Sequence, residues 1–445
     1  MDRPDSLRKS RSSLETGDVR LVCQDLFNFV SSAARTGRPS PGPRCAKGGA
    51  KGSGVSPSAR NPDTDSVGPG SARAGGVFLR DVALAARTTL GLGGPARWFG
   101  RCTSVEDLHQ ALRHAREQDL EVSILAGGSN VVIADAGIDG LVLEPALRGL
   151  ELRPLRHEPG QVELRAAAGE PWDEVVAFAV AKGLAGIECL SGIPGSTGAV
   201  PVQNVGAYGQ DIASVLTRVQ ALDRESLEIV DLTPTELAFS YRDSALRRAP
   251  HRWIVLEVVL QLVTCPFGRA QYDELRKALG SDTAPLAELR ETVLRLRRSK
   301  SMVLDDTDEN HRSVGSFWKN PIVSAQLAES IAQRAVAAGL CARPEELPRF
   351  PAGLAALNQV KLPAAWLVER AGFARGFRRG RVGVSSRHTL ALVHHGAGTT
   401  AELLELASEI HGRVFDCFGL MLEPEPVFLG FGSRPFGEPA DAEGS

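Results

Sequence analysis

Residues 191–209 read SGIPGSTGAVPVQNVGAYG, and this stretch decides the fold more than any other part of the chain. Glycine lets a backbone approach a ligand closely, and an irregular segment of about twenty residues is uncommon and usually functional. Because Ile193, Val200 and Val202 are interspersed with polar residues, we expect the segment to be held against the core. It is predicted to form one wall of a dinucleotide site; the alternative is a mobile surface loop.

A second glycine-rich segment, Ala126-Gly-Gly-Ser-Asn130, joins two short apolar stretches that are predicted strands, 122–125 and 131–133. Successive backbone N–H groups around glycines can form an anion-binding nest. A simple hairpin turn remains the alternative. The segment lacks the GxGxxG-then-helix layout of the Rossmann fingerprint, so that fold is rejected.

A third segment, 314–321, reads VGSFWKNP and holds a hydroxyl, a cation and an amide close together. Such a cluster can bring a proton donor and anion-binding groups to one place. Ser316 alone could equally be an ordinary helix N-cap or turn serine. Together with the two glycine-rich segments, the cluster favours a flavin enzyme that places a serine over its substrate.

Three further charged residues are candidates for the site. Arg242, in YRDS, can bind a carboxylate with two parallel hydrogen bonds, or it could form an ion pair with Asp243. Glu425, in LEPEP, has its direction fixed by flanking prolines, although an isolated glutamate is more often a surface charge. Lys300 could be a helix C-terminal charge.

The composition excludes several classes of protein. The 445 residues allow two or three domains, and the 43% apolar fraction is typical of a globular chain. A net charge of -2 gives no global field for nucleic acid or membranes, and neither partner is expected. The seven cysteines are scattered without a CxxC motif, and the nine histidines form no HExxH motif. We therefore expect no metal site and a reducing, cytoplasmic location.

Residues 1–76 differ from the rest and are predicted to be a disordered, low-complexity extension. Within residues 1–75, twelve Lys and Arg face seven Asp and Glu, a balance of +5. Such a segment cannot bury enough apolar surface to order itself, apart from a short amphipathic turn near 21–30. A transit peptide is disfavoured by the acidic residues, and a start codon assigned too early is the other explanation.

The remaining pattern predicts an α+β fold with short strands and chemistry carried by loops. Thr103 and Glu106 form a predicted capping box for a helix. Residues 162–168, 253–263 and 417–428 are predicted strands. The predicted helices are 171–182, 286–298, 364–371 and a long one capped at Thr399 and Glu402.

Read together, these motifs resemble the UDP-N-acetylenolpyruvoylglucosamine reductase family over residues 84–428. The further matching pieces are TTLGLGG at 88–94, FSYRDS, KLPAAWLVERAG and VGVSSRH at 382–388. The resemblance implies an FAD-binding domain of the vanillyl-alcohol-oxidase (PCMH) type over 77–265 and a smaller α+β substrate-binding domain over 266–432. A loose tail, 433–445, is expected to follow.

The resemblance also implies a reaction. NADPH would reduce a non-covalently bound FAD, and reduced FAD would convert the enolpyruvyl ether of UDP-N-acetylglucosamine to UDP-N-acetylmuramate, a step of bacterial peptidoglycan synthesis. It implies Ser316 as proton donor, with Arg242 and Glu425 stabilising the charge that develops. We expect burial to raise the pKa of Glu425, so that it can donate a hydrogen bond. The enzyme is expected to be a monomer.

The resemblance gives two sets of binding residues. The FAD-binding candidates are Ala126, Gly127, Gly128, Ser129, Asn130, Gly192, Ile193, Pro194, Gly195, Ser196, Gly198, Asn204, Gly206, Ala207 and Tyr208. The candidates for binding the UDP moiety are Tyr272, Lys300, Lys319 and Asn320. Tyr272 resembles the tyrosine of a mobile loop found in one subtype of the family.

Two other functions are compatible with a flavin-binding domain. One is a sugar or alcohol oxidase, for which VGSFWKNP and LEPEP would have no use. The other is a regulatory module without enzymatic activity, which would be expected to lack the set of Ser316, Arg242 and Glu425. Turnover of NADPH that depends on the enolpyruvyl nucleotide separates all three.

Overall fold

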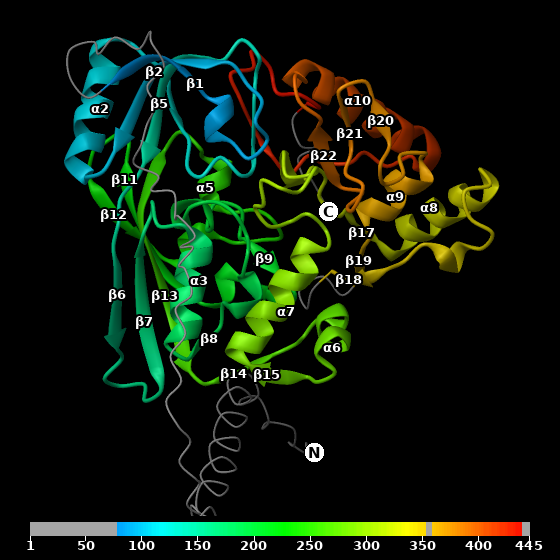
Figure 1. Cartoon of the computed structure of the whole chain (residues 1–445), viewed down its shortest axis with the longest axis horizontal. Coiled ribbons are helices and arrows are strands. Elements are labelled where there is room, and N and C mark those ends of the chain that lie inside the picture. The colour runs from blue at the N-terminus through cyan, green and yellow to red at the C-terminus, as the bar shows by residue number, and fades with distance from the viewer. Residues whose placement is uncertain (1–77, 353–357, 438–445) are drawn as a thin grey trace, which may run out of the picture. The chain divides into compact units, whose positions relative to one another are not determined.

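The structure of the chain is a computed structural model that describes residues 78–352 and 358–437. All of these residues belong to one compact unit, Pro69–Ser445. The predicted extension over 1–76, with its amphipathic turn, lies outside the described residues. Figure 1 shows the order of the elements, and the labels below follow it.

The first sheet is mixed, and one helix covers it (Figure 1). Its strands, in spatial order, are β1 (Leu79–Ala83), β2 (Pro95–Cys102), β5 (Ile138–Pro145) and β3 (Val122–Ile124). Helix α2 (Val105–Glu117) packs its apolar face on β2 and β5. The capping box of α2 lies one residue later than predicted, at Ser104 and Asp107, because Asp107 rather than Glu106 reaches back to the N-cap N–H.

The second sheet is antiparallel and carries the largest buried strand. Its strands, in spatial order, are β12 (Ile229–Leu232), β11 (Leu216–Asp223), β13 (Trp253–Thr264), β7 (Gln161–Ala167) and β6 (Leu150–Pro154). β8 (Leu184–Ala185) also pairs with β13. The buried residues of β13 pack with those of α3 (Trp172–Ala181) in one core cluster. The predicted strand and helix in this region are confirmed.

A small helical layer follows the second sheet. Its elements are α4 (Pro234–Leu237), α5 (Ala245–Arg248), β14 (Phe267–Arg269), α6 (Asp273–Leu279), β15 (Thr283–Pro285) and α7 (Leu286–Arg298). Helix α7 has the predicted bounds. Cys189 packs between the apolar faces of α6 and α7, against Leu275 and Leu289. Helix α7 thereby covers the glycine-rich segment that begins near Cys189 (Figure 1).

The C-terminal region has two small sheets and three longer helices. Its elements are β16 (Ser313–Ser316), β17 (Ile322–Ser324), α8 (Ala325–Ala337), β18 (Phe350–Pro351), β19 (Gln359–Lys361), α9 (Ala364–Arg370), β20 (Arg378–Arg379), β21 (Val382–Val384), β22 (Ala391–His394) and α10 (Thr400–Phe418). The strands pair in the orders β16-β22-β21-β20 and β17-β19-β18. Helix α10 contacts α8, α9, β21 and β22, and its apolar face is buried in the core of this region.

The remaining elements are single turns of 3-10 helix and pairs of bridge residues. They are η1 (Ala85–Arg87), η2 (Glu188–Leu190), η3 (Thr197–Ala199), β9 (Gly206–Ala207), β10 (Gln210–Asp211), η4 (Ile212–Ser214) and η5 (Pro344–Glu346). Several of them lie within residues 188–212. The glycine-rich segment expected to be irregular is therefore a series of tight turns, almost all of whose residues are buried or half-buried.

The C-terminal region returns to the first half of the chain through one parallel strand pair. β4 (Val131–Ile133) pairs with β23 (Val427–Leu429) rather than with β3. The glycine-rich turn at 126–130 therefore connects strands of two different sheets, and the hairpin alternative is wrong. The long strand predicted over 417–428 is also wrong, because α10 continues to Phe418 and ends at Gly419 in the left-handed conformation.

A second link between these regions is made at the start of α10. Thr399 and Glu402 form the predicted capping box. The carboxylate of Asp135, which follows β4, accepts hydrogen bonds from the N–H groups of Thr400 and Ala401, each 2.8 Å long. A negative charge at a helix N-terminus is stabilising because the first N–H groups lack partners within the helix.

We expect Asp135→Ala to lower the free energy of unfolding by about 1 kcal/mol, the usual cost of removing a helix cap. Urea unfolding followed by circular dichroism measures it. Asp139→Ala is the matched control, since its side chain is 85% exposed and makes only a surface ion pair with Arg97. Equal unfolding free energies for the two variants would contradict the role of Asp135.

The segment after 432 differs from the expected loose tail where the structure describes it. Phe436 packs edge-on against Trp318, with ring centroids 5.4 Å apart, and also contacts Phe317. An aromatic side chain buries a large area, so a single one can hold a short segment to the core. Residues 438–445 lie outside the described part.

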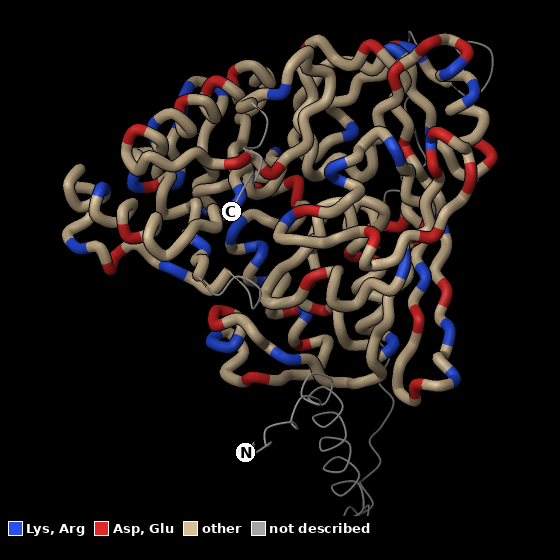
Figure 2. The backbone as a smooth tube through the Cα atoms, turned by 180° about the vertical axis from the view of Figure 1, so that it is seen from behind, with Lys and Arg blue, Asp and Glu red and all other residues tan. Residues whose placement is uncertain are grey.

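Charges of both signs are interspersed along the backbone, as Figure 2 shows from behind. The distribution agrees with the small net charge of -2. Within the described residues, no helix combines the length and apolarity needed to span a bilayer.

Candidate active site

One cavity of about 390 Å³ lies at the centre of the loops, within the usual size range of ligand sites. Its lining comes mainly from five stretches of chain, within 122–131, 193–206, 242–255, 297–316 and 425–429. The cavity thus collects residues from both glycine-rich segments and from the VGSFWKNP and LEPEP motifs.

The two glycine-rich segments lie directly against each other. The Ser129 hydroxyl donates a hydrogen bond to the Pro194 carbonyl (3.0 Å). A Cβ atom on Gly127 would lie 2.6 Å from the Cα of Gly195, so Gly127 tolerates no side chain without a backbone shift, and a Cβ on Gly195 would lie 2.7 Å from the Ser129 hydroxyl oxygen. The absence of side chains leaves backbone N–H groups bare at the cavity wall, where a bound phosphate can accept hydrogen bonds.

Within the two glycine-rich segments, Gly128 is the position at which a side chain would meet the closest backbone atom. Its φ is +60°, and a Cβ there would lie 2.1 Å from the carbonyl oxygen of Arg87. We expect Gly128→Ala to lose flavin and to unfold at a lower temperature, since left-handed backbone alone costs about 1–3 kcal/mol. Flavin absorbance of the purified protein and thermal unfolding measure both effects.

Gly412→Ala is the control for this substitution. Gly412 lies within α10, and a Cβ there meets nothing within 4 Å. That variant should retain its flavin and be stabilised slightly, because alanine favours a helix over glycine by about 1 kcal/mol. Full flavin content in Gly128→Ala would remove the segment from the cofactor site.

Most of the predicted FAD-binding residues line the cavity. Those that do are Ala126, Gly127, Gly128, Ser129, Asn130, Ile193, Pro194, Ser196, Gly198 and Gly206. The other five, Gly192, Gly195, Asn204, Ala207 and Tyr208, do not line it. Asn204 instead bonds to the Ser240 carbonyl and the Ala213 N–H.

Ser316 and Glu425 are held beside each other by main-chain bonds. The Glu425 N–H donates to the carbonyl of Phe317 (2.8 Å), and the Lys319 N–H donates to the carbonyl of Glu423 (2.9 Å). Trp318 and Pro424 form an isolated bridge between these two bonds. Both Ser316 and Glu425 line the cavity, so the short ladder sets their separation.

Arg242 reaches the side chain of Glu425 from a different segment of the chain. It occupies the third position of a tight turn, with φ of +57°, an uncommon conformation that the local fold must enforce. Its Nη2 donates to the Gly206 carbonyl (2.9 Å), and its Nε lies 3.1 Å from the Glu425 carboxylate. The Arg242 guanidinium therefore lies against the carboxyl of Glu425 and not against that of Asp243, because Asp243 pairs with Arg248.

The environment of Glu425 favours its protonated form. Burial raises the pKa of its carboxyl, while the positive charges of Arg242, Arg247 and Lys319 work in the opposite direction. The direction of the shift is the one expected from the sequence. A raised pKa widens the pH range in which the carboxyl is protonated and can donate a hydrogen bond.

The four candidate substrate residues lie outside the lining of this cavity. Lys300 forms an ion pair with Glu274 (2.6 Å). Tyr272 is half exposed and contacts Tyr208 edge-on, with ring centroids 6.0 Å apart. Lys300 lies over the same Tyr208 ring (5.8 Å), so the three side chains form one cluster beside the start of α6 and the end of α7.

Lys319 and Asn320 have local partners of their own. Lys319 pairs with Glu423. The side-chain oxygen of Asn320 accepts a hydrogen bond from the N–H of Ala364 (2.9 Å), at the start of α9. The structure therefore gives Asn320 a capping role in addition to any contact with a ligand.

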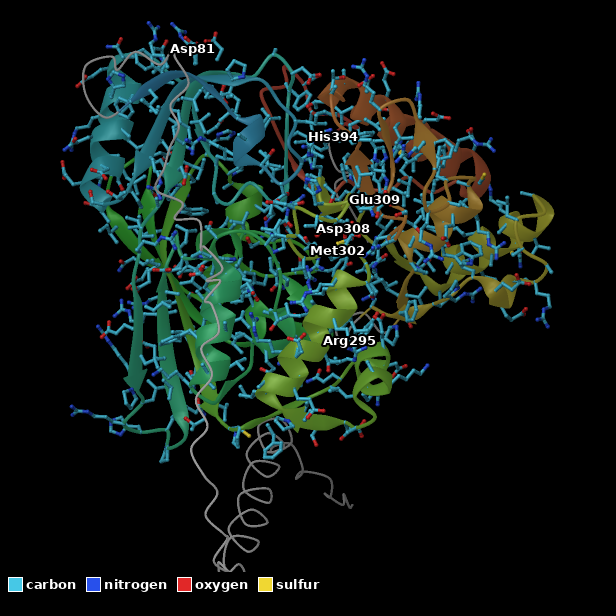
Figure 3. The ribbon with its side chains drawn as sticks, in the orientation of Figure 1. Asp81, Arg295, Met302, Asp308, Glu309 and His394 are labelled. Atoms are coloured by element: carbon cyan, nitrogen blue, oxygen red, sulfur yellow. The ribbon has the colours of Figure 1, made fainter. Side chains whose placement is uncertain are left out.

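Sequence reasoning missed Arg297, which lines the cavity from the last turn of α7. Its Nη2 donates to the carbonyl of Met302 (2.6 Å), a residue that Figure 3 labels. Its buried Nε has no hydrogen-bond partner among the described residues. Burial lowers the pKa of its guanidinium to about 10. The signal was available, because Arg297 is four residues from the buried Val293 and so shares the covered face of the helix.

The residues present fit FAD. The two bare glycine segments suit a diphosphate. Arg297 and Ser196 line the cavity, and the Arg297 Nε and the Ser196 hydroxyl have no hydrogen-bond partner among the described residues. Apolar side chains such as Val202 and Leu429 line other parts of the cavity and suit a flat aromatic ring system. No group of His, Cys, Asp or Glu in the described ranges could hold a metal ion.

Comparison with known proteins agrees with this site. Residues 97–232 match the family described as FAD binding domain, and residues 306–429 match UDP-N-acetylenolpyruvoylglucosamine reductase, C-terminal domain. The fold and the site therefore define a flavoprotein with an α+β fold and an FAD-binding domain, as the sequence predicted.

Relatives that match most of the chain identify the family within this class of flavoproteins. UDP-N-acetylenolpyruvoylglucosamine reductase from Streptomyces coelicolor is 44% identical over 79% of this chain and 90% of its own length. The enzyme of that name from Thermobifida fusca is 43% identical over 79% of this chain and 98% of its own. The chain belongs to the UDP-N-acetylenolpyruvoylglucosamine reductase family.

A solved structure supports the fold alone. UDP-N-acetylenolpyruvylglucosamine reductase from Thermus caldophilus superposes with a TM-score of 0.52 at 24% identity, over 79% of this chain and 98% of that one. The similarity therefore extends through both the flavin-binding and the C-terminal parts.

Proposed function

We propose that this enzyme reduces the enolpyruvyl ether of UDP-N-acetylglucosamine to UDP-N-acetylmuramate with NADPH, in peptidoglycan synthesis. Family membership supports the overall reaction. The observation that carries the proposal is the convergence of Ser316, Arg242 and Glu425 on one cavity, with Arg242 3.1 Å from Glu425.

The division of labour between domains is part of the proposal. The cofactor domain comprises 77–265 and the substrate domain 266–432. The glycine-rich segments and Arg297 would hold FAD without a covalent bond, and the bound flavin would supply the hydride, taken from NADPH, that the terminal alkene carbon receives. Release of all flavin on acid precipitation tests the non-covalent attachment, and retention of flavin on the protein contradicts it.

Arg242 binds the substrate carboxylate. When hydride reaches the terminal carbon, negative charge develops on the ether-bearing carbon and spreads into that carboxylate. A guanidinium already fixed by Gly206 stabilises this charge without reorganising. The alkene becomes more electrophilic for the same reason.

Glu425 and Ser316 act on two neighbouring groups of the substrate, its carboxylate and its ether-bearing carbon. Protonated Glu425 donates a hydrogen bond to the enolate-like carboxylate, which its raised pKa permits. Ser316 delivers the proton that completes the lactyl ether. Among the described residues, no side chain forms a hydrogen bond with the Ser316 hydroxyl. The group that returns its proton is therefore part of a bound ligand or a water molecule.

The nucleotide part of the substrate binds beyond the cavity. Lys300 and Tyr272 contact the diphosphate together with Lys319 and Asn320. The enzyme is of the family subtype with a closing tyrosine loop, and Tyr272 is the tyrosine of that loop. Its side chain is half exposed and therefore accessible to a ligand. Tyr272→Phe should raise the KM for the nucleotide; an unchanged KM would exclude the contact.

The enzyme acts as a monomer in the cytoplasm, where NADPH and nucleotide sugars are found, with no nucleic-acid or membrane partner. Size-exclusion chromatography with light scattering tests the monomer.

The decisive assay follows NADPH absorbance with and without the enolpyruvyl nucleotide. We expect consumption only when the nucleotide is present. Consumption driven by oxygen alone would favour an oxidase, and flavin binding without turnover would favour a regulatory module.

A further inference from the structure

The main-chain carbonyl of Glu425 accepts hydrogen bonds from three side chains. The donors are Nε2 of Gln203 (3.0 Å), Nη2 of Arg247 (3.0 Å) and Nδ2 of Asn130 (3.4 Å). A carbonyl oxygen has two lone pairs, so three donors saturate it. All three come from the flavin-binding half of the chain, whereas the N–H of Glu425 bonds to Phe317.

Arg247 differs from the other two donors because it does not line the cavity. It lies in α5, whose N-cap Ser244 accepts from the Arg247 N–H. The Ser244 hydroxyl donates to the carbonyl of Val202 (2.8 Å), which fixes α5 to the glycine-rich segment. Its neighbour Leu246 lines the cavity and Arg247 does not, so Arg247 contacts Glu425 from outside the cavity lining.

The charge of Arg247 is not neutralised by a close carboxylate. No ion pair involving it is recorded in the described part of the chain, and its buried Nη1 lacks a hydrogen-bond partner there. A buried cation without a partner is costly. Its retention beside a catalytic candidate requires a compensating role.

We propose that Arg247 is a positioning residue for Glu425, which fixes the Glu425 carbonyl through a hydrogen bond and keeps a positive charge behind the carboxyl. The inference rests on the proposed function and deepens it. Arg247 touches neither the reacting carbon nor the cofactor, so it acts only through Glu425.

The positive charge of Arg247 shifts the pKa of Glu425 in a predictable direction. The groups that face the Glu425 carboxyl are Arg242, Arg247, Lys319, Glu423 and Tyr241. Arg247 works against burial and lowers the pKa of Glu425. Removing the charge must therefore raise that pKa and keep Glu425 protonated to higher pH.

The test compares Arg247→Met with Arg295→Met in full-length, flavin-loaded enzyme. Arg295, labelled in Figure 3, is an exposed arginine of α7, so its loss removes the same charge at the surface. For Arg247→Met we expect kcat to fall about tenfold, the loss of one hydrogen bond from a charged donor. The KM for the nucleotide should stay within about twofold, and the alkaline limb of kcat should move to higher pH.

Arg247→Lys separates position from charge and remains informative if the methionine variant fails to fold. It should restore the alkaline limb to the wild-type pH while kcat stays below wild type. The inference would be overturned if Arg247→Met kept both the wild-type kcat and the wild-type alkaline limb of the kcat–pH profile. It would also be overturned if the alkaline limb of Arg247→Lys were displaced from that of the wild type. Failure of the wild-type enzyme to turn over would instead overturn the proposed function.

Discussion

Replacing Ser316 by alanine is expected to leave reduction of the flavin by NADPH nearly intact and to slow its reoxidation by the enolpyruvyl nucleotide by about 10²- to 10⁴-fold. That range is the usual cost of losing a general acid. The reason is that Ser316 lines the cavity beside Glu425 but is needed only when the carbon is protonated. Stopped-flow absorbance of the flavin follows the two half-reactions separately.

Ser316→Cys is the matched variant for this experiment. A thiol keeps an acidic hydrogen at the same position, although its longer bonds and larger sulfur misplace it. We expect reoxidation at a rate between those of wild type and Ser316→Ala. A reoxidation rate in Ser316→Ala equal to that of the wild type would remove the hydroxyl from the mechanism.

Arg242→Ala is expected to have the other large effect. Loss of one preorganised group that stabilises developing charge costs about 10²- to 10³-fold. Reoxidation should slow by that factor and the KM for the nucleotide should rise, because Arg242 binds the carboxylate in the ground state as well. Alanine at a φ of +57° is no more strained than arginine, so unfolding should change little through the backbone.

Arg242→Lys tests whether charge alone is sufficient. Lysine keeps the positive charge but not the planar fork that can bond to a carboxylate and to the Gly206 carbonyl together. We expect it to recover only part of the lost rate. Flavin content and thermal unfolding of both variants control for damage to the fold, and turnover equal to wild type in either variant would exclude the role.

Local sequence patterns predicted the elements whose residues pack on their own neighbours. The buried face of α7 and the strand β13 follow from apolar spacing, and the capping box of α10 follows from Thr399 and Glu402. The prediction of a strand over 417–428 failed because apolar residues of a buried helix and of a strand look alike over a short window.

Pairings between distant residues could not be predicted from periodicity. The partner of β4 lies almost three hundred residues later in the chain, and nothing in 126–133 indicates it. The likeness to a family brought Ser316, Arg242 and Glu425 to attention, but local pattern gave no sign that Phe317 would bond to Glu425. Arg297 was missed because a basic residue near a helix C-terminus is ordinarily solvated.

The pairing of β4 with β23 has a consequence for the order of events in the cell. Residues 427–429 are synthesised almost three hundred residues after the strand with which they pair. Chain elongation is slow relative to local folding, and amino-terminal parts fold first. The segment at 126–130 must therefore wait until residues 427–429 have been synthesised before its neighbouring strand has a partner, so the flavin-binding wall is completed late in folding.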